Sequence, residues 1–193
     1  MQAPSRTVGV LALQGAFRAH ESALRQLGVA TVQVRTVEQL DRVDALVIPG
    51  GESTTMSKLL DSSGLFDPIA KRIADGMPTF GTCAGMILLA TDVADGRPDQ
   101  RSFAALDIGV RRNGFGRQID SFEADIALAG DPDPFHAVLI RAPRIERCGN
   151  GVEVLAAHHS EPVLVRQGPI VAASFHPELT GDTRVHAIFL QEA

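Results

Sequence analysis

The sequence contains no apolar run close to the ~18–20 residues that a membrane-spanning helix requires. Its 18 Lys and Arg are outnumbered by 23 Asp and Glu and form no cluster, so we expect neither a nucleic-acid-binding nor an anionic-membrane surface. Internal repeats and low-complexity tracts are also missing. These absences favour a soluble globular enzyme and leave small neutral or zwitterionic substrates open.

Cysteine is scarce: the chain has only Cys83 and Cys148, in different contexts. Residues 1–6 lead into an ordinary strand rather than the apolar core of a signal peptide, so we expect a reduced, cytoplasmic protein. With 193 residues, of which 45% are hydrophobic and 21% charged, the chain can bury one sizeable core. We therefore expect one domain over residues 1–193.

Alternating strand and helix patterns predict an α/β fold. A nearly continuous apolar run over 7–13 is typical of a central parallel strand covered on both faces. Helical spacing follows over 17–27 and ends before Gly28, and a second strand over 29–34 completes a βαβ unit with a right-handed crossover. Further along the chain we expect helices over 65–74 and 183–190, strands over 45–48, 121–128, 137–143, 152–157, 162–166 and 170–173, and a surface loop over 91–100.

Residues 78–89 predict the end of a buried strand, a sharp turn at Cys83 and the start of a helix. Gly81 and Gly85 flank the turn, and we attribute to them a tolerance of strained backbone. The turn places the sulfur beside the free N–H groups of the helix, which favour the thiolate, the attacking species. A lone cysteine in an apolar segment is also a common core residue. Only a nearby base would favour a nucleophile at Cys83 over a core residue. Cys148 is expected in a polar turn, without a catalytic role.

The candidate base is His176, which follows the last strand and precedes Glu178 by two residues. Side chains two apart on extended backbone point to the same face, and Pro177 disfavours helix at His176, so the carboxylate can hold the imidazole. Such an imidazole can take a thiol proton and return it to a leaving group. Because Cys83 and His176 both follow strands, we predict a Cys–His–Glu triad.

Two other loops suggest binding. Residues 49–55 carry adjacent Gly50 and Gly51 after a strand, on the rim where ligands bind in open α/β sheets. Residues 111–118 combine arginines with glycines, which indicates either a solvated hairpin or a positively charged lip for a carboxylate. His20, on the first helix, is expected to be a partly exposed or helix-capping residue. Adjacent His158 and His159 lack a third ligand, and we expect no metal site.

Six sequence blocks resemble a known family. They are Leu13–Ala16, Pro49–Thr54, Gly81–Gly85, Arg112–Gln118, Ile140–Pro143 and Ser174–Thr180. The cysteine and histidine blocks are similar to the class I (triad) glutamine amidotransferases. Taken together, the blocks resemble the PdxT family of glutaminase subunits of pyridoxal 5′-phosphate synthase, over nearly the whole chain. The resemblance implies a three-layer α/β domain whose mostly parallel central sheet is flanked by helices and extended by antiparallel strands.

The resemblance also implies an activity and its residues. L-Glutamine would be hydrolysed through a Cys83 thioester with His176 and Glu178, and backbone N–H groups of Gly51 and Ala84 would hold the oxyanion. The implied substrate contacts are Gly51, Glu52, Ser53, Arg112, Ile140 and Arg141. No cofactor is implied. The partner would be a (β/α)₈ synthase that receives the ammonia, and docking would rearrange the Gly50–Gly51 loop.

Two other interpretations stay open from the residues alone. A stand-alone cysteine hydrolase on the same architecture, for example one that cleaves γ-glutamyl peptides, would act at full rate without a partner. A regulatory binding module would keep the fold without the chemistry. Ammonia release with and without the synthase separates the first of these from a partner-dependent glutaminase.

Overall fold

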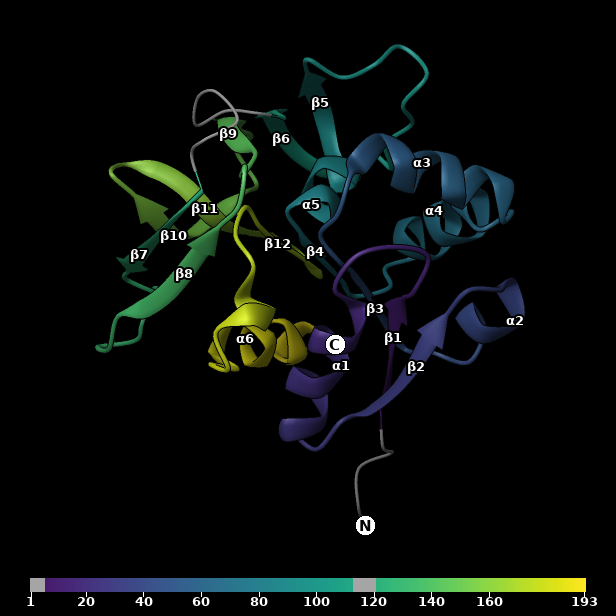
Figure 1. Ribbon diagram of the computed structural model, residues 1–193, viewed down its shortest axis with the longest axis horizontal. Coiled ribbons are helices and arrows are strands. Elements are labelled where there is room, and N and C mark those ends of the chain that lie inside the picture. Colours follow the sequence, from purple (N-terminus) through teal and green to yellow (C-terminus); the bar gives the residue numbers. More distant parts are fainter. Residues whose placement is uncertain (1–5, 113–120) are drawn as a thin grey trace.

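The centre of the fold is a seven-stranded sheet. A computed structural model describes residues 6–112 and 121–193 of the chain (Figure 1). In order across the sheet, the strands are β10 (Glu153–His158), β11 (Glu161–Gln167), β12 (Ile170–Ala173), β4 (Thr79–Thr82), β3 (Ala45–Ile48), β1 (Thr7–Leu11) and β2 (Ala30–Val34). The five from β12 to β2 run parallel, and β11 and β10 add an antiparallel edge. The expected mostly parallel sheet with an antiparallel extension is confirmed.

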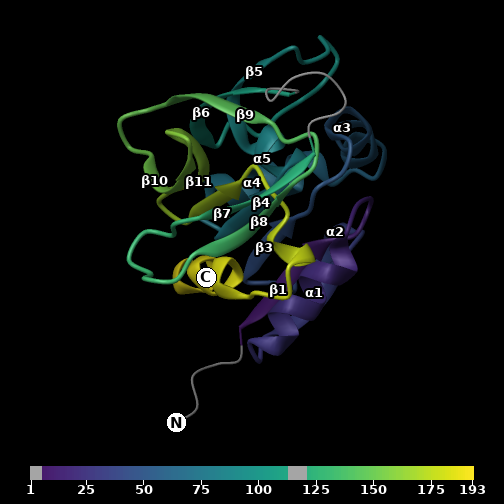
Figure 2. The same cartoon turned by 60° about the vertical axis from the view of Figure 1, so that its left-hand side comes forward.

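Helices cover both faces of this sheet. On one face lie α1 (Phe17–Gln26) and α6 (Arg184–Glu192), and on the other lie α3 (Ser53–Ser62), α4 (Phe66–Ala74) and α5 (Ala84–Leu89); a short α2 (Val37–Leu40) and a 3₁₀ turn η1 (Pro177–Leu179) complete the helical elements of the described residues (Figures 1 and 2). In the described part of the chain, no helix combines the length and the apolar character needed to cross a membrane.

The two faces divide the apolar residues of each strand by alternation. In β3, Leu46 and Ile48 pack with the α3 and α4 side, whereas Ala45 and Val47 pack with the α1 and α6 side. All four side chains are fully buried. A strand covered on both faces must be apolar at every position, which explains why the sequence shows continuous runs rather than alternation.

Two smaller sheets lie beside the central one. The first holds β5 (Ala90–Ala94), β6 (Leu106–Arg111) and β9 (Arg144–Cys148), and the second pairs β7 (Phe122–Ile126) with β8 (Phe135–Leu139). The surface loop expected over 91–100 is therefore wrong in its first part, because β5 pairs with β6 through contacts distant in sequence. The polar turn expected at Cys148 is also wrong, since Cys148 ends β9 opposite Ile108.

Two further boundaries differ from expectation. The loop expected over 49–55 is shorter, because α3 begins at Ser53 with Glu52 as its N-cap. The strand expected over 137–143 lies at Phe135–Leu139, so Ile140 and Arg141 follow the strand instead of ending it. The first shift places Ser53 in a helix, and the second places Ile140 and Arg141 on a loop.

The register of the central strands brings three loops to one edge of the sheet. Ile48 of β3 pairs with Gly81 of β4, and Thr82 of β4 pairs with Ala173 of β12. The Cys83 N–H continues this pairing by donating to the Ala173 carbonyl at 2.8 Å. Since parallel strands end at a common edge, the loops after β3, β4 and β12 meet there.

Candidate active site

Cys83 occupies a strained turn between β4 and α5. Its φ of 50° and ψ of −103° lie outside the usual regions for a non-glycine residue, a geometry that costs on the order of 1–3 kcal/mol. The flanking glycines serve packing rather than strain. A Cβ on Gly85 would lie 2.0 Å from the Ile48 carbonyl oxygen, and one on Gly81 would lie 2.7 Å from the Gly85 carbonyl carbon. The backbone strain predicted for the glycines is therefore carried by the cysteine.

This turn sets the surroundings of the thiol. Cys83 is only 7% exposed and is the N-cap residue of α5. The first N–H groups of a helix have no intrahelical acceptor and carry partial positive charge, and Ala84 supplies the first of them. The Cys83 side chain therefore lies at the positive end of this helix.

His176 lies beside Cys83 on the loop after β12. A Cβ placed on Gly50 would lie 2.4 Å from His176 Cε1 and 3.3 Å from Cys83 Cβ, so the ring and the thiol adjoin the same point of the Gly50 backbone. Burial alone would lower the pKa of His176, but hydrogen bonds to Cys83 and Glu178 and the charges of both outweigh burial and raise that pKa to about 10. The ring is therefore poised to hold a proton taken from the thiol.

Glu178 holds the other side of this ring. His176 Nδ1 and Glu178 Oε1 are 2.9 Å apart. The extended backbone expected here is only partly right, because Glu178 lies in η1 and the carboxylate reaches the ring across the start of that turn. Burial would raise the pKa of Glu178, but the neighbouring His20 and the hydrogen bond from His176 hold that pKa below its usual range. The carboxylate is therefore ionised and can accept from Nδ1–H.

His20 extends this constellation in a way the sequence interpretation missed. It is fully buried, so the expectation of a partly exposed or capping residue is wrong. Its Nε2 lies 3.4 Å from Glu178 Oε2, and its Nδ1 lies 2.9 Å from Nε2 of His186, which is also fully buried. The helical spacing could have indicated this burial, because His20 precedes buried Leu24 by four positions and so shares its helix face.

The glycine loop closes the site from the β3 side. His176 and Cys83 leave no room for a side chain at Gly50, as described above, and Gly51 has a φ of 156°, which L residues rarely adopt. The peptide after Gly51 is held by Gln14, whose side-chain amide is placed to donate to the Glu52 carbonyl and accept from the Glu52 N–H, both at 3.3 Å. The loop after β1 thus supports the loop that carries the predicted oxyanion donor.

Three of the predicted substrate contacts lie together at the start of α3. Glu52 caps the helix and forms an ion pair with Arg112, Oε1 to Nη2, at 2.8 Å. Burial would raise the pKa of Glu52, but several hydrogen bonds from Thr55 and Thr54 together outweigh burial and lower that pKa to about 2. Ser53 Oγ is buried and has no hydrogen-bond partner among the described residues. The rest of the predicted arginine-rich turn, residues 113–118, lies outside the described residues.

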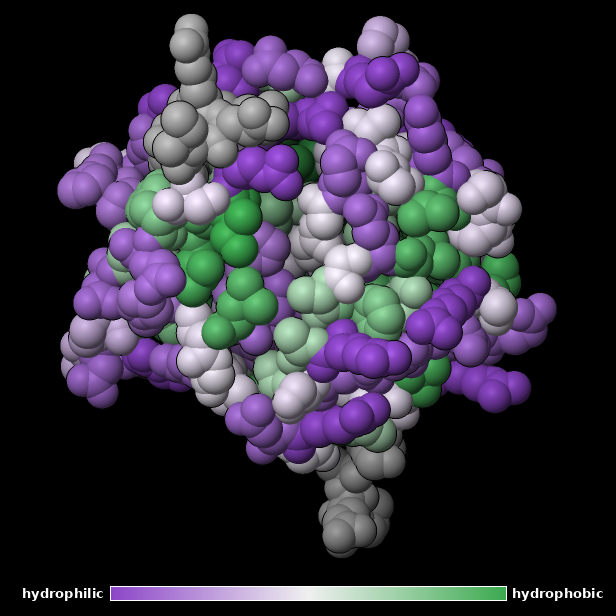
Figure 3. Space-filling model, in the orientation of Figure 1, coloured by the Kyte–Doolittle hydropathy of each residue, from purple (hydrophilic) through white to green (hydrophobic). Residues whose placement is uncertain are grey.

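Ile140 and Arg141 reach the same region from β8. The His176 N–H donates to the Val138 carbonyl at 2.9 Å, which joins the end of β8 to the loop that carries His176. Arg141 follows with a φ of 44° and an exposed side chain that forms no ion pair within residues 6–112 and 121–193. Ile140 is 38% exposed, and Figure 3 shows apolar surface over the region of β8. An exposed guanidinium beside an apolar surface suits a ligand carboxylate on an aliphatic stem.

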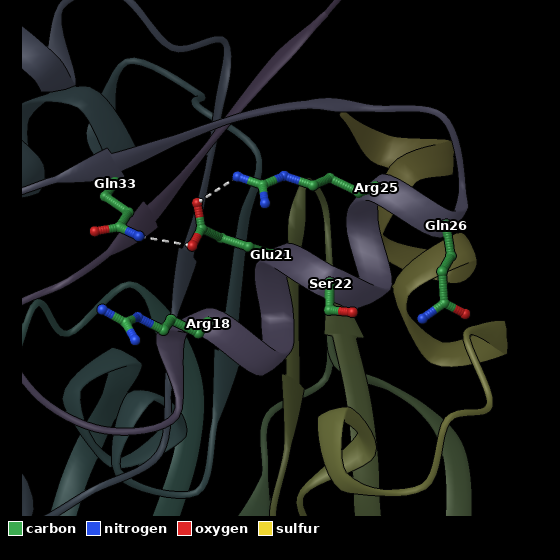
Figure 4. Close-up of a pocket in the computed structure, with 6 residues that line it drawn as sticks. All are labelled: Arg18, Glu21, Ser22, Arg25, Gln26 and Gln33. Atoms are coloured by element: carbon green, nitrogen blue, oxygen red, sulfur yellow. Dashed lines mark hydrogen bonds and ion pairs between the residues drawn. The ribbon is translucent and has the colours of Figure 1, made fainter.

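Other candidate sites lie away from this edge. Within the described ranges, no group of three or more His, Cys, Asp or Glu residues could hold a metal ion. A surface hollow along the outer side of α1 contains none of the predicted site residues (Figure 4). Its lining consists of Arg18, Glu21, Ser22, Arg25, Gln26 and Gln33. In it, Glu21 accepts from Arg25 at 3.2 Å and from Gln33 at 2.8 Å, so the one carboxylate of the hollow already has partners within it.

Comparisons with known proteins agree with this geometry. Residues 10–193 match the model of the SNO glutamine amidotransferase family. The chain is 58% identical to the pyridoxal 5′-phosphate synthase subunit PdxT of Salinispora arenicola, covering 98% of this chain and 96% of the relative. It is 57% identical to the protein of the same name from Nocardia farcinica, covering 97% and 86%.

Solved structures support the same architecture. A crystal structure described as a glutamine amidotransferase is 51% identical, covers 95% of this chain and 97% of its own, and superposes with a TM-score of 0.89. The structure of PurLQS from Thermotoga maritima shares the fold at 14% identity and a TM-score of 0.70, covering 97% of this chain and 98% of its own.

Proposed function

The chain belongs to the SNO glutamine amidotransferase family, and we propose that it hydrolyses L-glutamine to L-glutamate and ammonia as the glutaminase subunit of a pyridoxal 5′-phosphate synthase. The observation that carries the proposal is the meeting of Cys83, His176 and Glu178 at one edge of the sheet. We further propose that residues 1–193 form one glutaminase domain that works in the cytoplasm.

In the first step, Cys83 Sγ attacks the side-chain amide carbon of glutamine. His176 takes the thiol proton, and Glu178 stabilises the resulting imidazolium through Nδ1–H. The tetrahedral intermediate then expels ammonia, which receives the proton from His176. A γ-glutamyl thioester remains on Cys83.

In the second step, water attacks the thioester carbon. His176 accepts a proton from that water and returns it to the departing thiol, so glutamate leaves and the starting state is restored. The same ring therefore acts as base, acid, base and acid in one cycle. Its hydrogen bond to Glu178 keeps Nε2 directed at the reacting atoms.

The oxyanion of both intermediates is assigned to the N–H groups of Ala84 and Gly51. Ala84 begins α5 directly after the nucleophile, and Gly51 lies on the loop that touches His176 and Cys83 through Gly50. Each such donor is typically worth about 3–4 kcal/mol in the transition state. The Gln14 amide lies beside the peptide that follows Gly51.

Substrate selection is assigned to charges around this centre. Glutamine carries an α-ammonium and an α-carboxylate, which an ionised Glu52 and the guanidinium groups of Arg112 and Arg141 can pair with. In the structure, Glu52 and Arg112 pair with each other, so a bound glutamine would share or replace that ion pair. Ser53 and Ile140 complete the proposed contacts.

The partner is proposed to be the (β/α)₈ synthase subunit that consumes the ammonia. The relatives are named as synthase subunits, which supports a heteromeric assembly. Free ammonia becomes protonated in bulk water, so a glutaminase that serves a synthesis gains from releasing its product inside a complex. Docking is expected to rearrange the Gly50–Gly51 loop and raise activity.

The decisive experiment compares Cys83→Ala with Cys148→Ala in a complex with the synthase. Ammonia release from glutamine should fall to background in the Cys83→Ala complex, because the attacking sulfur is lost. Cys148→Ala should stay within about twofold of the unsubstituted chain, because Cys148 lies at the end of β9, away from the triad.

Two results would contradict the proposal. The first is unchanged ammonia release by Cys83→Ala in an intact complex. The second is full activity of the chain alone with no stimulation by the synthase, which would favour a stand-alone hydrolase.

A further inference from the structure

A second imidazole lies against the far oxygen of the catalytic carboxylate. Glu178 Oε1 bonds His176 Nδ1 at 2.9 Å, while Oε2 is buried and has no hydrogen-bond partner among the described residues. His20 Nε2 approaches Oε2 at 3.4 Å. A buried carboxylate oxygen without a donor is costly, so this approach needs an explanation.

Building on the glutaminase function proposed above, we propose that His20 is a positioning residue: its Nε2–H holds Glu178 Oε2, and His186 fixes the tautomer in which that proton is present. His20 does not touch the substrate. It acts by fixing the plane and the charge of Glu178, which in turn orients His176.

The surrounding atoms select one tautomer of His20. An ionised carboxylate accepts but cannot donate, so a bare Nε2 facing Glu178 would set two lone pairs against each other. With hydrogen on Nε2, that N–H donates to Thr82 Oγ1 at 3.2 Å and keeps its partial positive charge beside Glu178 Oε2, which lies 3.4 Å from Nε2. His20 Nδ1 is then the acceptor for His186 Nε2–H at 2.9 Å.

The surroundings of His186 favour the same tautomer of His20 on separate grounds. His186 Nδ1 is buried and has no hydrogen-bond partner in the described parts of the chain. In the opposite arrangement this atom would be a buried N–H without an acceptor, which native structures rarely contain. In the proposed arrangement it is a bare nitrogen, a smaller defect.

Both extra histidines are uncharged in this arrangement. Burial lowers the pKa of His20, against the raising effect of Glu178, and His176 lowers it further. Burial together with His20 lowers the pKa of His186 to about 3. Glu178 is thus held by a neutral N–H and keeps its negative charge available for the imidazolium form of His176.

The cluster is packed so that these rings cannot turn freely. Phe80 sits edge-on to His20 at 6.1 Å and to His186 at 5.7 Å between ring centroids. Phe189 stacks on Phe80 at 5.6 Å. The rings come from α1, β4 and α6. Their packing therefore connects both helices of this face to the edge of the sheet where Cys83 and His176 lie.

The test compares His20→Phe with His20→Gln in the complex with the synthase. His20→Phe keeps a ring and removes the donor, and we expect kcat for ammonia release to fall roughly tenfold or more while KM for glutamine changes by less than about twofold. His20→Gln supplies an amide N–H and should recover most of the loss. The matched control is His136→Gln, an exposed histidine on β8 that bonds Asp125 and Glu123.

A second measurement does not depend on any variant folding. In the unsubstituted, ¹⁵N-histidine-labelled chain, nitrogen shifts near pH 7 should show His20 and His186 both neutral and both protonated on Nε2. A His20 protonated on Nδ1, or a doubly protonated His20, would overturn the proposal. So would His20→Phe with unchanged kcat, or His20→Gln as impaired as His20→Phe.

Failure of the two proposals can be told apart. If the unsubstituted chain with its synthase releases no ammonia from glutamine, the proposed function fails, whatever the tautomer of His20. If that complex is active and His20→Phe matches it, only the positioning role fails.

Discussion

At the level of single residues, two buried histidines near the site have pKa values shifted in opposite directions. His176 and His186 are both buried histidines, but His176 contacts Cys83 and Glu178, whereas His186 contacts His20 and has one ring nitrogen without a hydrogen-bond partner in the described residues. The pKa of His176 is raised to about 10 and that of His186 is lowered to about 3. The partners, and not burial alone, decide which imidazole carries a proton.

These opposite shifts predict how stability depends on pH. An unfolded histidine titrates near pH 6.5. Below that pH the unfolded chain binds protons at His20 and His186, whereas the folded chain does not. The free energy of unfolding therefore falls as the pH is lowered. His176 behaves oppositely, because its contribution is complete below pH 6.5 and is lost as pH rises toward about 10. We therefore expect maximal stability near neutral pH.

Urea titrations between pH 6.5 and 5 measure the acid side of this dependence. The free energy of unfolding should fall by at most ~1.4 kcal/mol per pH unit for each buried histidine. His186→Phe should flatten the slope, because it removes one of the two. Equal slopes for His186→Phe and the unsubstituted chain would show that His186 is not held neutral in the folded state.

At the level of strands and helices, the site depends on close backbone contacts at strand ends. The loops after β3, β4 and β12 meet at the site with the loop after β1 beside them. The register of these four strands is set by apolar side chains buried on both faces, each worth roughly 1.5–3 kcal/mol when fully buried. The register leaves no space for side chains where the loops cross. Gly50 is the clearest case, because the His176 ring lies against the position of its missing Cβ.

Gly50→Ala is expected to damage catalysis more than folding. The added Cβ would lie 2.4 Å from His176 Cε1, so the ring must move away from Cys83, and a misplacement of about 1 Å can lower kcat roughly 100-fold. Steady-state ammonia release in the synthase complex measures the effect.

The control for this change is Gly28→Ala, at the end of α1. Gly28 has a φ of 78° and open space around its missing Cβ, so the substitution should cost about 1 kcal/mol of stability through backbone strain and leave kcat unchanged. Wild-type kcat in Gly50→Ala would mean that the loop and the ring are less tightly coupled than the structure indicates.

Across the molecule as a whole, one sheet supports both helical layers, and the smaller sheets pack at its β10–β11 end (Figure 2). The triad draws its members from the middle of the chain and from its C-terminal part. The strands that precede Gly50, Cys83 and His176 pair with one another in one sheet, so we expect folding to be cooperative over the whole domain.

Cooperative unfolding can be tested with two probes. The sequence has no Trp or Tyr, so far-UV circular dichroism is paired with thiol labelling of Cys148 in a Cys83→Ala background, where it is the sole thiol. Because Cys148 reports on β9 in the three-stranded sheet, coincident urea transitions indicate one unit. Two separated transitions would divide residues 1–193 into independent parts.

Local sequence is enough to predict the βαβ pattern, the turn at Cys83 and the pairing of His176 with Glu178, because these depend on periodicity and on residues adjacent in the chain. It is not enough for β5, which was expected as loop, or for Cys148, which was expected in a turn, because the partners of both strands are distant in sequence.

The use made of His20 follows only from how the chain packs. Its helix position shows which face it occupies, but not that Glu178 and His186, about 160 residues further along the chain, lie against that face. The same holds for Gly50, whose need to be glycine arises from a ring delivered by another strand. Packing decides which residues from distant segments come into contact, and so which chemistry they can support. A single sequence shows only that the residue types suit such a contact.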